Sequence, residues 1–198
     1  MKRILVVTLS AILLSCSFVA QARDEAEILR NEIEVRGFYR GDPTVRGYFE
    51  KAVTENVSLN LIAFKAHGWD EVTVGPTYYI TPEMSVSVGI GTSRYMASDE
   101  GEKSFHKTGS AFWFWKTDTW EAEVLVERYS RDRKPWYQEG YVQKRINNSF
   151  AVGIFAKTDG GWGPRLSYSI NKNVVVWVSP LVNKTGESPA IFGIKVSL

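Results

Sequence analysis

Apolar and polar residues alternate along most of this chain. In 84–93, Met84, Val86 and Val88 fall on one face of an extended segment, and Ser85 and Ser87 fall on the other. A period of two is typical of a β-strand whose two faces meet different surroundings. The same alternation recurs in several segments up to the last residue. The pattern therefore predicts an all-β chain.

Short polar turns separate these segments in pairs. Five tight turns, rich in Asn, Asp, Thr and Pro, lie at 54–56, 81–83, 117–119, 147–149 and 171–173. Such residues favour the backbone angles that close hairpins. The turns alternate with mostly longer connections rich in Gly and charge, the longest running from Arg94 to His106. Short turns at one end and longer loops at the other are typical of an up-and-down antiparallel transmembrane β-barrel.

The expected barrel has about twelve strands, with both termini on the periplasmic side. An alternative with ten strands, in which 32–53 is a plug or lead-in, stays open because 136–146 is polar on both faces. Pro76, Pro164 and Pro180 lie within expected strands and remove hydrogen-bond donors, so we expect them at rims or bulges. The expected strands are 32–39, 44–53, 57–66, 71–80, 84–93, 107–116, 120–130, 136–146, 150–157, 163–170, 174–182 and 189–198.

The first residues are typical of a secretory signal peptide. Lys2 and Arg3 precede an apolar run at 4–14, and Ala20-Gln21-Ala22 is a small-x-small cleavage site. The run is too short to span a bilayer. Cys16, the sole cysteine, follows a stretch that loosely resembles a lipoprotein cleavage box, so lipidation there stays open as an alternative. We expect a signal peptide at 1–22, a short lead-in at 23–31 and the barrel at 32–198.

The charge balance and the histidines exclude several functions. The leader holds two of the 24 Lys and Arg and none of the 22 Asp and Glu, so the mature chain is close to neutral. A neutral chain has no general attraction for nucleic acid. The two histidines, His67 and His106, have no spacing that fixes a catalytic dyad, and without cysteine they make a poor metal site. We therefore expect neither an enzyme nor a cofactor or metal.

Charged residues mark the face that we expect to line the lumen. Glu121, Glu123 and Glu127 share one face of a strand whose other face carries Trp120 and Val124. Because an unpaired charge in an apolar medium is costly, this face should point inward. We expect Arg145 and Arg165 to neutralise part of the glutamate row. The expected lumen or solute path comprises Arg36, Arg40, Arg46, Glu121, Glu123, Glu127, Arg145 and Arg165, with Glu34, Glu50, Glu139 and Lys195 also facing inward.

Tryptophans gather near the ends of the expected strands. Such positions are typical of the aromatic girdles that meet the two membrane interfaces. The alternative is aromatic core packing in a soluble barrel. The expected girdle residues are Trp69, Trp113, Trp115, Trp120, Trp136 and Trp162.

Two segments resemble known outer-membrane proteins. The last strand resembles the C-terminal strand of bacterial outer-membrane barrels, and Gly193, Val196 and Leu198 match the pattern that the barrel-assembly machinery reads. Residues 33–40 and 192–198 resemble the first and last strands of the small twelve-stranded porins for acidic oligosaccharides, the oligogalacturonate-specific and sialic-acid porins. The resemblance implies that Arg36 and Arg40 carry anionic sugars.

These observations together favour a narrow, passive, porin-like channel for small polar or charged solutes in the bacterial outer membrane. Its expected partners are outer-membrane lipid, the assembly machinery and a small solute. Two alternatives remain: a non-conducting structural or surface barrel in the same membrane, and a soluble periplasmic lipid-binding barrel with apolar residues inward.

Overall fold

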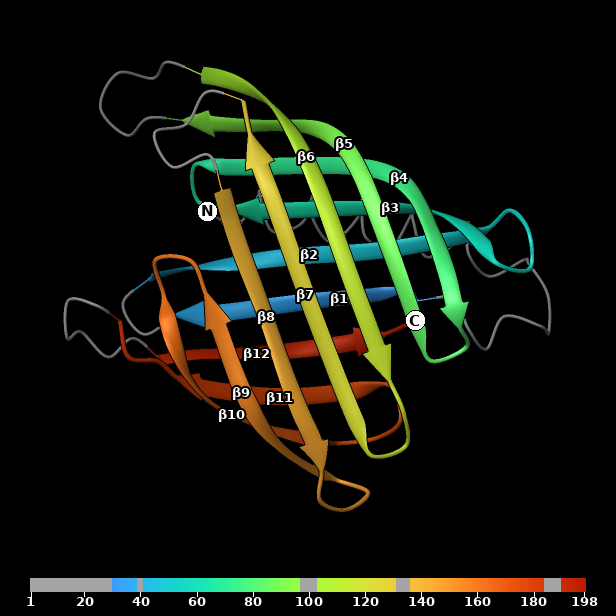
Figure 1. Ribbon diagram of the computed structural model, residues 1–198. Coiled ribbons are helices and arrows are strands. Elements are labelled where there is room, and N and C mark those ends of the chain that lie inside the picture. Colours follow the sequence, from blue (N-terminus) through green and yellow to red (C-terminus); the bar gives the residue numbers. More distant parts are fainter. Residues whose placement is uncertain (1–29, 39–40, 97–102, 131–135, 184–189) are drawn as a thin grey trace.

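The computed structural model describes residues 30–38, 41–96, 103–130, 136–183 and 190–198. These ranges form twelve strands in one closed antiparallel barrel (Figure 1). They contain no helix long and apolar enough to cross a membrane. The signal peptide, Cys16, most of the lead-in and Arg40 lie outside the described residues. The strands are β1 (Glu32–Phe38), β2 (Gly41–Ala52), β3 (Val57–Ala66), β4 (Trp69–Thr81), β5 (Met84–Met96), β6 (Lys103–Lys116), β7 (Trp120–Tyr129), β8 (Trp136–Arg145), β9 (Phe150–Lys157), β10 (Gly161–Ser169), β11 (Val174–Pro180) and β12 (Ala190–Ser197).

The barrel closes between its first and last strands. Each strand pairs with its neighbours in sequence, and β1 also pairs with β12, placing Ile33 opposite Val196. Beyond the strand, the Leu198 amide donates to the Asn31 carbonyl at 2.8 Å. The ten-stranded alternative is therefore wrong, because β1 and β2 are full members of the sheet.

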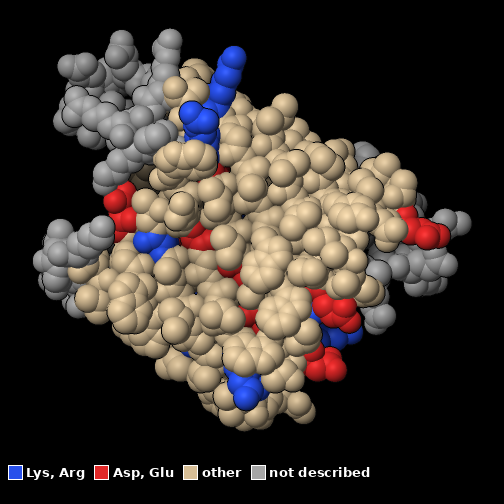
Figure 2. Space-filling view, in the orientation of Figure 1, with Lys and Arg blue, Asp and Glu red and all other residues tan. Residues whose placement is uncertain are grey.

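Side-chain parity separates an apolar exterior from a polar interior. The outward positions carry exposed apolar side chains around the barrel: Leu59, Leu61, Val72, Val74, Val86, Val88, Ile90, Val124, Val142, Val152, Ile154, Leu166, Val178, Phe192 and Ile194. Figure 2 shows a face that is mostly free of charged atoms, which lie mainly toward its margins and in narrow gaps. Charged side chains are present at one rim of the barrel, where Lys65 and Arg94 pair with Asp70. An apolar belt that encircles a closed barrel suits lipid and not water.

The interior contradicts a soluble lipid-binding barrel. Such a barrel would place its apolar side chains inward, whereas here the buried inward positions include Glu34, Glu123, Glu139 and Arg165. The chain thus has the two-sided pattern of a membrane-spanning barrel.

The three prolines named above have outward parity. Pro76 and Pro164 lie within strands and not at the rims that we expected, whereas Pro180 is the last residue of β11. Pro76 lies within β4 opposite Leu59, and the β4–β5 ladder omits residues 75 and 76. The β10–β11 ladder has only four pairs, from Leu166 opposite Val178 to Ser169 opposite Val175. On the other side of Leu166, one isolated bridge joins Trp162 and Val182. Continuing that register places Pro164 opposite Pro180, so neither residue can donate to the other strand. This seam is the shortest ladder in the described barrel.

Candidate functional site: the charged lumen and its mouth pocket

Arg46 on β2 lies at the centre of an ion-paired network in the lumen. Its guanidinium bonds Glu123 at 2.6 Å, Glu139 at 3.2 Å and Glu34 at 3.3 Å. Glu123 lies on β7 and Glu139 on β8, so the contacts cross the lumen from one wall to the other. The side chains of these three glutamates are at most 6% exposed. Buried charges of this kind need partners on all sides.

Arg36 extends the network toward β11. It bonds Glu34 and Glu139, the latter at 2.6 Å. Glu34 also accepts a hydrogen bond of 2.7 Å from the Trp177 indole. The carboxylates of Glu34 and Glu139 therefore each accept hydrogen bonds from more than one donor. These bonds fix the positions of Arg36 and Arg46.

Arg30 and Lys195 continue the network toward the short-turn end. Arg30 bonds Glu32 and Glu123, at 2.6 and 2.5 Å, and its guanidinium lies 4.4 Å from the ring centre of Phe114. Lys195 bonds Glu121 at 3.0 Å. We had placed Arg30 in the lead-in outside the barrel. Its even number, in step with the inward Glu32 and Glu34, is the sequence signal that could have identified it.

The predicted partners of the glutamate row are wrong. Arg145 has the inward parity of β8, but its side chain is exposed beside the short turn at 146–149. Arg165 is buried between Tyr141 and Trp177, 4.1 and 3.9 Å from their ring centres. Its Nε and Nη1 atoms have no hydrogen-bond partner among the described residues. Instead, Glu121 pairs with Lys195 and Glu123 pairs with Arg30 and Arg46, whereas Glu127 forms no ion pair among the described residues. The order of charges along one strand does not fix which strand lies opposite.

The wall formed by β3 to β6 carries one buried charge, Glu71, at its mouth end. Its other buried polar residues are small and mostly carry hydroxyl groups: Ser58, Asn60, Thr73, Thr77, Ser85, Ser87, Ser93, Thr108 and Ser110. The hydroxyls of Thr77 and Ser87 are 2.7 Å apart, and that of Tyr48 lies 3.1 Å from Ser87. This wall leaves room for Tyr48 and Phe112, whose rings pack 5.2 Å apart. Most of the buried lumen charges accordingly lie on the remaining strands.

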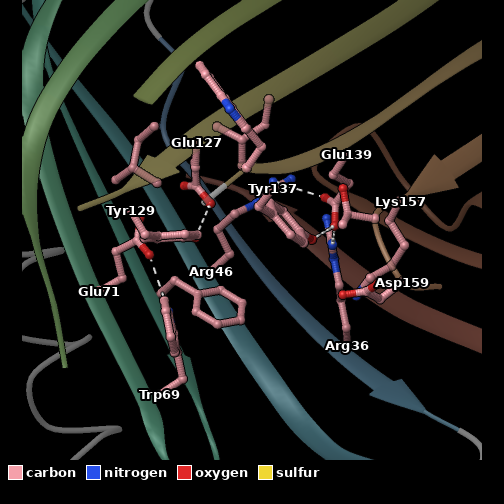
Figure 3. A pocket seen from close by; sticks show the side chains of 15 residues that line it. Arg36, Arg46, Trp69, Glu71, Glu127, Tyr129, Tyr137, Glu139, Lys157 and Asp159 are labelled. Atoms are coloured by element: carbon pink, nitrogen blue, oxygen red, sulfur yellow. Dashed lines mark hydrogen bonds and ion pairs between the residues drawn. The ribbon is translucent and has the colours of Figure 1, made fainter. Parts of the chain in front are cut away.

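A pocket of about 310 Å³ opens at the mouth end, opposite the short turns. Arg36, Arg46 and Glu139 of the network line its inner part. Figure 3 shows Glu71 and Glu127 on one side of this mouth pocket with Trp69 and Tyr129, and Lys157 and Asp159 on the other. The lining residues are Arg36, Arg46, Ile62, Phe64, Trp69, Glu71, Leu125, Glu127, Tyr129, Trp136, Tyr137, Glu139, Lys157, Thr158 and Asp159.

Five of the six expected girdle tryptophans have outward parity: Trp113, Trp115, Trp120, Trp136 and Trp162. Trp69 does not. Its indole donates to Glu71 at 3.2 Å and meets the Tyr129 ring edge-on at 5.0 Å, inside the mouth. The expected strand began at 71, whereas β4 begins at Trp69 and continues the inward parity of Glu71.

The described residues contain no group of three or more His, Cys, Asp or Glu side chains that could hold a metal ion. His67 lies at the turn between β3 and β4, and His106 lies on β6. They are therefore on different elements near the mouth end.

Comparison with known proteins identifies the architecture. No family model matches the chain, and no curated protein matches its sequence significantly. Among solved structures, the KdgM porin aligns with a TM-score of 0.54 at 14% identity, covering 84% of this chain and 99% of that one. The chain has the fold of a small outer-membrane barrel.

Two further structures share this fold. The Acinetobacter baumannii outer membrane protein Omp33 has a TM-score of 0.50 at 10% identity, covering 86% of this chain and 99% of its own. The Salmonella typhi outer membrane phospholipase dimer has a TM-score of 0.50 at 10% identity, covering 90% and 94%. Porins and a phospholipase thus share one architecture, so function has to be argued from the lumen residues.

Proposed function

We propose that this protein is an outer-membrane channel that passes small polar solutes through a narrow, ion-paired constriction. The observation that supports this proposal most directly is the convergence of Arg36, Arg46 and Glu139 at the inner end of an open mouth pocket. The polar path continues from these residues toward the short-turn end through Arg30, Glu123 and Lys195. A belt of apolar side chains outside and charges of both signs inside fit a lipid-embedded path for water-soluble molecules.

A solute would pass by replacing contacts within the network. Arginine and glutamate side chains are long and rotatable, so a polar solute can exchange one ion pair for another as it moves. Because each of Arg30, Arg36 and Arg46 bonds at least two carboxylates, the constriction is narrow. We therefore expect low conductance and passage of small solutes only.

The lumen charges favour cations over anions. Carboxylates outnumber cations among the charged side chains that point inward and are buried or half-buried, in the described strands and at Arg30. The carboxylates are Glu32, Glu34, Glu50, Glu71, Glu121, Glu123, Glu127 and Glu139, and the cations are Arg30, Arg36, Arg46, Lys157, Arg165 and Lys195. A KdgM porin has been solved in complex with disordered oligogalacturonate, an acidic solute. Here Arg36 is already paired with Glu34 and Glu139, so a path for acidic sugars is less well supported.

The test is conductance in planar bilayers under a KCl gradient. The wild-type reversal potential should indicate cation preference, and Glu123→Lys should move it toward anions. Glu83→Lys, which changes an exposed residue of the 82–83 turn, is the matched control and should leave it unchanged. A non-conducting wild type, together with marked destabilisation by Glu123→Lys, would instead establish a closed structural barrel.

A further inference from the structure

Glu71 and Glu127 in the mouth pocket are buried carboxylates without a cation. Each is 7% exposed. Glu71 accepts a hydrogen bond from the Trp69 indole, and Glu127 accepts one of 2.8 Å from the Tyr129 hydroxyl. Among the described residues neither forms an ion pair, whereas Glu34, Glu123 and Glu139 each bond at least one arginine. A buried acid pair of this kind attracts a positive group into the space beside it.

The other side of the pocket carries a cation, Lys157, that forms no ion pair with the described residues. The Lys157 ammonium lies 4.9 Å from the ring centre of Phe38 and 5.8 Å from that of Tyr137. Glu139 and Asp159 act on it through space, but neither forms an ion pair with it in the described part of the barrel. The Arg36 guanidinium nearby is already bonded to Glu139 at 2.6 Å. Lys157 is thus the cation available to an incoming anionic group.

The space between the two sides is apolar and of limited size. Ile62, Phe64 and Leu125 line it. A volume of 310 Å³ equals a sphere about 8 Å across, at the lower end for small-molecule sites. An extended dipeptide spans at most about 7 Å. A single α-amino acid, which carries its ammonium and its carboxylate on the same carbon, would not reach both sides.

We propose that the mouth pocket binds a zwitterion of dipeptide length with an apolar side chain. Its ammonium lies beside the carboxyl groups of Glu71 and Glu127, which hydrogen-bond one another. Its apolar side chain contacts Ile62, Phe64 and Leu125, and its carboxylate lies at Lys157. As an entry step for transport, the site rests on the proposed channel function. Binding itself does not require conduction.

The experiment measures binding calorimetrically with the folded barrel in detergent micelles. The probes are alanyl-phenylalanine, its N-acetyl derivative, its C-terminal amide and the doubly blocked compound. Removing either charge should weaken binding by about tenfold or more, since each loses a charge-assisted contact in a largely desolvated site. Equal affinity of the free and acetylated dipeptides would overturn the proposal.

Two variants test which side of the pocket binds the ammonium of the dipeptide and which side binds its carboxylate. Glu127→Gln should abolish the preference for the free over the acetylated dipeptide, and Lys157→Met should abolish the preference for the free dipeptide over the amide. Glu83→Gln and Lys172→Met, at exposed turn positions, are matched controls and should keep both preferences. Heat-modifiable migration on SDS gels shows that each variant is folded. Full retention of both preferences by the pocket variants would place the binding elsewhere and refute the site.

Failure of this site and failure of the channel give different results. Dipeptide binding without conductance defeats the channel alone. Conductance without charge-dependent dipeptide binding defeats the pocket proposal alone.

Discussion

The Trp177 indole lies against Gly193, its register partner on the neighbouring strand β12. A Cβ atom at position 193 would come within 2.5 Å of the indole nitrogen, which donates its hydrogen bond to Glu34. The glycine that matches the assembly pattern therefore also has a packing role, because only hydrogen at this position leaves room for the ring that anchors Glu34.

Gly193→Ala should displace Trp177 and weaken the Glu34 contact. We expect a loss of about 1–3 kcal/mol in the free energy of unfolding, typical of overpacking. Urea unfolding in lipid vesicles, followed by tryptophan fluorescence, measures it. Gly109→Ala is the matched control because a Cβ there meets nothing within 4 Å. Equal stability of both variants and the wild type would show that Trp177 adjusts freely.

The two lumen arginines Arg46 and Arg165 should differ in their contribution to stability. Arg46→Met leaves Glu123 and Glu139 with fewer partners, and removing one member of a buried ion-paired set costs about 3–5 kcal/mol. Arg165→Met should cost less, since Nε and Nη1 of Arg165 have no hydrogen-bond partner in the described part of the chain and methionine keeps the contacts with the rings of Tyr141 and Trp177. Urea midpoints in vesicles give the order, and the reverse order would contradict the network described above.

The proline-interrupted seam should be the least protected part of the described sheet. The bridge between Trp162 and Val182 is separated from the β10–β11 ladder by Pro164 and Pro180. We expect the amides of Trp162 and Val182 to exchange with deuterium faster than those of Leu166 and Val178, because isolated hydrogen bonds open without disrupting their neighbours. Residue-resolved exchange by NMR in micelles makes the comparison. Similar rates at all four amides would mean that the seam opens only with the whole barrel.

Deleting residues 196–198 should prevent membrane insertion. The deletion removes the pairing of Val196 with Ile33 and the bond from Leu198 to Asn31, both at the closing seam. The measurement is the yield of heat-modifiable protein in the outer-membrane fraction. Replacing the three residues by alanines keeps the backbone bonds, so it separates barrel closure from side-chain recognition by the assembly machinery. Normal insertion of the truncated chain would exclude both roles.

The mouth end should face the cell exterior. His67 lies exposed at this end, and Asn148 lies exposed in a short turn at the other. A membrane-impermeant maleimide should label His67→Cys on intact cells and Asn148→Cys only after lysis. Labelling in the opposite sense would invert the barrel and place the mouth pocket in the periplasm.

Alternation and turn residues were enough to predict the strands, the facing of most of their residues and the short turns. Expected and observed bounds agree exactly for β3 and β9 and closely for most of the others. Asn147 and Asn171 show why the short turns could be predicted. Each side-chain oxygen accepts hydrogen bonds from the backbone amides two and three residues later. These features depend on neighbours in sequence, so a one-dimensional pattern contains them.

Which charged side chains meet in the lumen depends on the three-dimensional arrangement of the strands. Arg30 bonds Glu123 across 93 positions, and the Trp177 indole reaches Glu34 across 143. Strand tilt and stagger set which residues lie level across a barrel, and alternation carries no information about either. For that reason the inward face of Glu121, Glu123 and Glu127 was predicted correctly, while their partners and the mouth pocket emerged only once the barrel had closed.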